Sequence, residues 1–142
     1  MCQMLMPQIG GSMSDQTVKI SFSSKNRRVL IHKSTLRALG MPQYIRFLLN
    51  KHRKCVAVQV CEAIDRDCFK VPDLKPEDVY EISSVNFVKM VYTLGDWNIN
   101  SSYRVCGEAY SEKRLVEFDL TAAITITEEE FEDDEKSAGY AG

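Results

Sequence analysis

The chain has 142 residues, a length that suits one ordinary domain or two very small ones. Hydrophobic residues make up 44% and charged residues 27%, a balance typical of folded, water-soluble proteins. The net charge is -2, and the longest apolar runs fall far short of the roughly 20 residues that a membrane-spanning helix needs. A soluble globular protein is therefore expected, and a membrane-spanning one is not.

The first residues, MCQMLMPQIGGSMSDQ, lack the basic and apolar regions of a signal peptide. We predict that residues 1–15 form a disordered extension. The chain has five cysteines, an odd number, and no C-x-x-C motif. Without a secretory signal, this pattern predicts free thiols in a reducing compartment, here the cytoplasm.

The basic residues are concentrated in the first part of the chain. Residues 16–61 contain ten Lys or Arg and no Asp or Glu, whereas residues 62–142 contain eight basic and nineteen acidic residues. Such asymmetry predicts either a polyanionic partner for the basic part or mutual attraction between the two parts.

The basic segment 16–61 reads as strands, a short helix and a hairpin. The alternating residues 17–22 and the run 27–31 predict two strands joined by a turn. Ser34 is predicted to cap a short helix that ends at Gly40. The runs 43–49 and 55–61 predict a hairpin around the basic turn 50–54, NKHRK.

The second part of the chain repeats this order of elements. Residues 62–81 form a polar linker, and residues 82–126 read as a strand, a helix capped by Ser84, and a hairpin formed by 101–110 and 114–120. The acidic segment 127–142 is predicted to be disordered. The fold expected is therefore α+β, with two small strand–helix–hairpin units related by a degenerate internal repeat.

Residues 27–61 resemble the swapped-hairpin DNA-binding domain of AbrB-type regulators and MazE-type antitoxins. The resemblance is carried by Arg28, Val29, Ile31, Leu39 and Gly40, followed by two hairpin strands. The chain departs from that pattern by having arginine in place of the usual glycine at position 27 and histidine in place of the usual proline at position 32. The resemblance implies an intertwined homodimer or an internal pseudo-dimer. It also implies that Arg28, the preceding loop and Arg37 lie on the face that contacts DNA.

The cationic side chains predict a surface that binds duplex DNA. Arginine can read guanine edges with two hydrogen bonds, whereas lysine acts mainly as a point charge on phosphate. The alternative is a solvated face that complements the acidic part of the chain. The predicted DNA-binding residues are Arg27, Arg28, Lys33, Arg37, Lys51, Arg53 and Lys54.

The sequence gives little indication of a metal site or of catalysis. His52, Cys55, Cys61 and Cys68 lie close together, but their spacing does not match a zinc site, and cysteines on strands usually pack as small apolar residues. No motif of a hydrolase, nucleotide-binding enzyme or metalloprotease occurs. We therefore expect neither a metal, nor a cofactor, nor catalysis.

The function predicted is a cytoplasmic, AbrB-like transcription regulator without cofactor. The competing prediction is a protein-interaction module of a mobile element or phage, either an antitoxin or an inhibitor of a host nucleic-acid enzyme. The acidic tail could solubilise the chain, fold back on the basic face, or bind a partner protein, and Phe131 is the expected apolar anchor in either of the last two cases.

Overall fold

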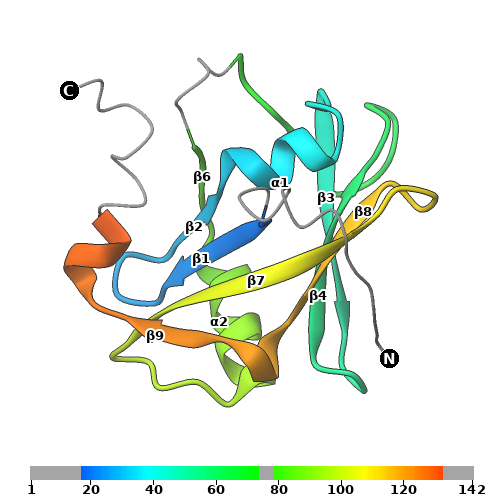
Figure 1. Cartoon of the computed structure of the whole chain (residues 1–142). Helices are drawn as coiled ribbons and strands as arrows, with labels where there is room; N and C mark the ends of the chain where they lie inside the picture. Colours follow the sequence, from blue (N-terminus) through cyan, green and yellow to red (C-terminus); the bar gives the residue numbers. More distant parts are fainter. Residues whose placement is uncertain (1–16, 74–78, 133–142) are drawn as a thin grey trace.

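The computed structural model describes residues 17–73 and 79–132, and these residues are mostly antiparallel β-strand (Figure 1). Residues 128–132 add a further helical segment after the last strand. The elements in chain order are β1 (Lys19–Ser23), β2 (Arg28–Ile31), α1 (Lys33–Ala38), β3 (Tyr44–Asn50), β4 (Cys55–Val60), β5 (Phe69–Lys70), β6 (Tyr80–Ser83), α2 (Val85–Gly95), β7 (Ser102–Tyr110), β8 (Leu115–Asp119), the 3-10 turn η2 (Leu120–Ala122) and β9 (Ile124–Ile126).

One curled sheet runs in the order β5-β3-β4-β8-β7-β1-β2-β6, and β9 pairs with β7 beside it. The long strand β7 joins the two sides of the sheet: its first residues pair with β1 and β9, and its last residues pair with β8. Gly107 lies where β7 passes from one side to the other. A Cβ atom there would lie 2.6 Å from the Phe118 ring and 2.7 Å from the Glu117 carbonyl oxygen, so the close approach of β8 requires glycine.

Strands of the first part of the chain pair reciprocally with strands of the second part. β2 pairs with β6, and β4 pairs with β8. Both pairs are antiparallel, with Arg28 opposite Ser83 and Ile31 opposite Tyr80 in the first. In addition, β1 pairs with β7, which places the first strand of the chain beside one of the last. The two halves are thus interleaved within one sheet.

The predicted α+β class is therefore wrong. Strands make up 41% of the described residues and helices 23%, and the sheet is a curled antiparallel half-barrel rather than a pair of helix–hairpin units. The predicted strands and helices lie close to their expected positions, but their hydrogen bonds cross between the two halves. Local periodicity predicts a strand and does not indicate which distant strand it will pair with.

A single large core lies between the inner faces of the sheet and α2. It contains Phe22, Ile45, Val58, Val91 and Phe118 among its buried members. Aromatic side chains pack around α2, where the Phe47 and Phe87 rings stack with centroids 4.3 Å apart and the Phe22 and Trp97 rings meet edge to face at 5.5 Å. Phe22 and Phe47 of the basic half are thus packing residues of the core.

The two helices begin differently from one another. The Ser84 hydroxyl accepts a hydrogen bond of 3.2 Å from the Phe87 N–H, which confirms Ser84 as the cap of α2. Ser34 does not cap α1, because the N-cap is His32, two residues earlier, and the helix starts at Lys33. Instead, the buried Thr35 ties α1 to β1: its hydroxyl donates to the Lys19 carbonyl at 2.7 Å and accepts from the Lys19 N–H at 3.0 Å.

Residues 127–132 are ordered, although the whole segment 127–142 was expected to be disordered. The Thr127 hydroxyl accepts from the Glu130 N–H at 3.0 Å, and a Glu130 carboxylate oxygen accepts from the Thr127 N–H at 2.8 Å, which is a capping box. The Phe131 side chain is fully buried beside Leu30 and Ile126. The remaining predicted disorder, in 1–15 and 133–142, lies outside the described residues.

No helix within the described ranges is long and apolar enough to cross a membrane.

Candidate nucleic-acid interface

The structure separates the predicted DNA-binding residues into three places. Arg27 and Arg28 lie at the start of β2, Lys33 and Arg37 lie on α1, and the other three lie in the turn between β3 and β4. In Figure 1 the β1–β2 turn lies at the left, beside the helical segment 128–132, and the β3–β4 turn lies at the lower right. The seven residues therefore do not form one continuous surface.

Acidic residues from the second half of the chain form ion pairs with basic residues at and just before the start of β2. The guanidinium of Arg28 pairs with Glu81 at 3.1 Å and lies 5.5 Å from the centroid of the Phe131 ring. Lys25, in the preceding turn, pairs with Glu128 at 3.3 Å. At this edge the basic and acidic halves attract each other, as the alternative to DNA binding predicted. Arg28 would have to leave both partners before it could reach a base.

The α1 positions are more open but carry mixed charge. Arg37 is exposed near the end of the helix, and Lys33 is half-buried at its start. Arg37 and Glu108 line the same shallow hollow between α1 and β7. A carboxylate so close to the arginine weakens the positive potential that a phosphate would meet.

The turn between β3 and β4 contains basic residues and no acidic residue. Residues 51–54, Lys-His-Arg-Lys, are all exposed, and the Asn50 side chain fixes the turn by accepting from the Arg53 N–H at 3.1 Å. Arg53 reaches Glu117 at 3.4 Å, with 63% of its side chain exposed. Among the described residues, Lys51 and Lys54 have no ion-pair partner.

α2 brings a third lysine to this turn. Lys51, Lys54 and Lys89 line one open cavity of about 710 Å³, which we call the cationic groove. Its apolar lining comes from Leu49, Met90 and Leu94, and Thr93 and Asp96 complete it. Lys89 likewise has no ion-pair partner in the part of the chain that the structure describes.

Lys89 was missing from the predicted site. The sequence did hold a signal, because residues 89, 90, 93 and 94 follow the helical spacing that places side chains on one face. Of that face only Leu94 packs against the core, whose buried members from the same helix are Val88, Val91 and Tyr92. What the spacing does not reveal is that this face lies opposite the basic turn.

Of the candidate metal ligands, the structure brings Cys61 and Cys68 together and leaves His52 and Cys55 apart from them. His52 lies in the exposed turn, Cys55 is buried at the start of β4, and Cys61 follows the end of the same strand. Burial, aided by nearby carboxylates of β8, raises the pKa of the Cys55 thiol. The expectation of free thiols throughout is wrong for Cys61 and Cys68, which form a disulfide, and holds for Cys55 and Cys106.

Comparison of the chain with models of protein families, with curated proteins and with solved structures found no match.

Proposed function

We propose that the chain binds duplex DNA through the cationic groove and the adjoining turn 51–54. The observation that carries the proposal is the convergence of Lys51, Lys54 and Lys89 on one hollow. The three lysines come from a turn and from a helix that are distant in sequence, and none pairs with a carboxylate of the described residues.

Electrostatics supports an anionic partner for this arrangement. Three ammonium groups and one carboxylate, that of Asp96, line the groove, so its charge is positive on balance, and an exposed cationic surface attracts a polyanion. Each phosphate that a lysine contacts releases condensed counterions from DNA, which favours binding at low salt. Arg53 and His52 project from the same turn and would extend the contact along the phosphate backbone.

The resemblance to AbrB-type regulators supports a role in transcription. In that family two hairpins are exchanged between partners, and here the two halves of one chain pair reciprocally. We therefore propose a cytoplasmic transcription regulator that contacts DNA through the cationic groove. Because Arg28 is held by Glu81 and Phe131, the groove and not Arg28 would supply most of the affinity.

A salt titration of DNA binding tests the proposal. The triple variant K51A/K54A/K89A should bind more weakly than the wild type and should reduce the slope of log affinity against log salt by about 1 per lost phosphate contact. The control is Lys113→Ala, in the exposed turn between β7 and β8, which should leave affinity and slope unchanged. Equal loss in the control and the triple variant would refute the groove as the DNA contact.

The apolar lining of the groove favours a second candidate, a protein-interaction module. Met90 is 48% exposed in the groove beside Leu49 and Leu94, and phosphate gains nothing from apolar surface. An acidic peptide with one apolar side chain would use both the lysines and this lining. The substitution Met90→Ser separates the two candidates, because it should weaken binding to such a synthetic peptide and leave DNA affinity unchanged.

A further inference from the structure

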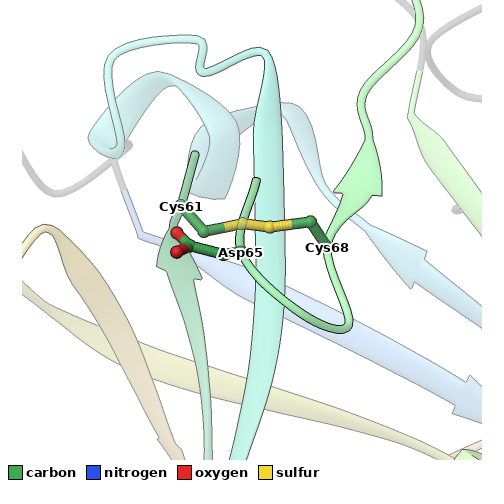
Figure 2. A group of neighbouring side chains, drawn as sticks. All are labelled: Cys61, Asp65 and Cys68. Atoms are coloured by element: carbon green, nitrogen blue, oxygen red, sulfur yellow. A yellow bond between two sulfur atoms is a disulfide. The ribbon is translucent and has the colours of Figure 1, made fainter. Parts of the chain in front are cut away.

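We propose that Cys61, Asp65 and Cys68 form a binding site for a thiophilic divalent cation, with Zn²⁺ as the best fit, when the two thiols are reduced. The side chains of the three residues face one another across the loop between β4 and β5 (Figure 2). One ligand atom from each lies within 4.8 Å of the others. This site is separate from the DNA-binding proposal and does not depend on it.

The spacing of the three ligand atoms suits a tetrahedral metal. Zinc holds thiolate sulfur at about 2.3 Å and carboxylate oxygen at about 2.0–2.2 Å, so tetrahedral ligands lie about 3.3–3.8 Å apart. The three ligand atoms lie within 4.8 Å of one another, so the loop already gathers them around one point. Two thiolates and one carboxylate favour zinc over magnesium or calcium, which prefer oxygen ligands.

The sheet holds both cysteines in place. The Cys61 N–H donates to the Tyr44 carbonyl at 3.1 Å, at the end of the β3–β4 ladder. Cys68 directly precedes β5, in which Phe69 pairs with Ile45 of β3. Both ends of the loop are therefore attached to β3, and the sulfurs stay close to each other when no bond joins them.

Backbone hydrogen bonds orient the carboxylate. The Glu62 N–H donates to Oδ2 of Asp65 at 2.7 Å, and the Asp65 N–H donates to the Glu62 carbonyl at 2.9 Å. The second oxygen, Oδ1, has no partner among the described residues and can bind the metal. Cys61 is buried, whereas Asp65 and Cys68 are half-buried, so solvent can reach the site and supply the fourth ligand.

Oxidation and metal binding exclude each other at this site. In the disulfide both sulfurs are used, as the structure has them. Exchange with a small-molecule disulfide converts the two thiols into the protein disulfide and releases two small-molecule thiols. Zinc binding instead displaces one proton from each thiol and leaves the oxidation state of sulfur unchanged. The loop would thus bind metal in its reduced form and lose the metal on oxidation.

The test is a Zn²⁺ titration of the full chain, reduced with a phosphine and then freed of it, in competition with a chromophoric chelator. The reduced wild type should bind one Zn²⁺ per chain and protect two thiols from alkylation, and the oxidised form should bind none. Cys68→Ser should abolish binding, and Asp65→Asn should weaken it at least about tenfold. The exposed free cysteine supplies the control, since Cys106→Ser should change nothing.

Three outcomes would overturn the proposal: no Zn²⁺ bound by the reduced wild type, equal loss in C106S and C68S, or wild-type affinity in D65N. Co²⁺ gives a second readout, because thiolate coordination produces a charge-transfer band that must vanish in C68S. Far-UV circular dichroism shows whether each variant is folded. The groove variant K51A/K54A/K89A should bind Zn²⁺ normally, because Cys61 lies at the opposite end of β4 from the turn 51–54, so the two proposals can fail independently.

Discussion

Truncation of Phe131 to alanine should release the acidic segment from the sheet without unfolding the main core. Phe131 is fully buried, but its neighbours Leu30, Ile126 and Val79 form a small cluster distinct from the main core. Burial of a phenylalanine side chain contributes about 1.5–3 kcal/mol, and the Arg28 guanidinium over its ring adds about 0.5–1 kcal/mol. The exposed pair Lys25–Glu128, which the substitution leaves in place, stabilises the docked segment by at most about 1 kcal/mol and does not enter the difference.

The expected loss is therefore about 3 kcal/mol of local stability, which corresponds to a roughly 100-fold rise in local opening. Native-state hydrogen exchange measures this directly. The Phe131 amide, which donates to the Thr127 carbonyl, should exchange about 100-fold faster, while amides of α2 keep their protection. Ile124→Ala, at a 54% exposed position on β9, is the control and should have little effect. Unchanged exchange at Phe131, or equal acceleration in α2, would refute a locally docked segment.

Two further substitutions test the packing of the core. Tyr92→Phe removes a buried hydroxyl that accepts a hydrogen bond from the Ser24 N–H at 3.0 Å. The free energy of unfolding, measured with denaturant, should fall by about 1–3 kcal/mol. The control Tyr110→Phe, on the exposed part of β7, should change it little. Burial raises the pKa of Tyr92 to about 12. The neutral phenol therefore stabilises the fold fully below pH about 10, and this stabilisation should be lost as the pH rises through about 12. The Y92F variant, which has no phenol to ionise, should not show this loss. Gly107→Ala should destabilise by about 1–3 kcal/mol, because the new Cβ would overlap the Phe118 ring; a variant as stable as the wild type would contradict the close approach of β8 to β7.

Local elements could be predicted from the sequence because their signals are local. The hairpin expected at 43–49 and 55–61 is observed at Tyr44–Asn50 and Cys55–Val60. Ser84 caps α2 as expected, because a serine followed by an amphipathic stretch is a sufficient signal. Strand pairing was not predictable in the same way, because β1 pairs with a strand some 80 residues further on. Nothing within either segment specifies that partner.

The acidic segment shows how composition can mislead. Its charge predicts disorder, yet Thr127 and Glu130 at capping-box spacing, followed by Phe131, are a helix-start signal that the charge run conceals. Only one part of the candidate site could be predicted from the sequence. The basic turn 51–54 is visible in the sequence, but Lys89 joins it only because α2 packs beside the hairpin.

The reciprocal pairing of the two halves also sets the order in which the chain can fold during synthesis. β4 is completed at Val60, but its partner β8 ends only at Asp119. Roughly 60 further residues must be translated before that pairing forms, which takes about 3–12 s at ~5–20 residues per second. During that interval the first hairpin has an unpaired edge and a full complement of basic charge. The nascent chain is therefore most exposed to aggregation, and to binding by polyanions such as ribosomal RNA, before its acidic half has emerged.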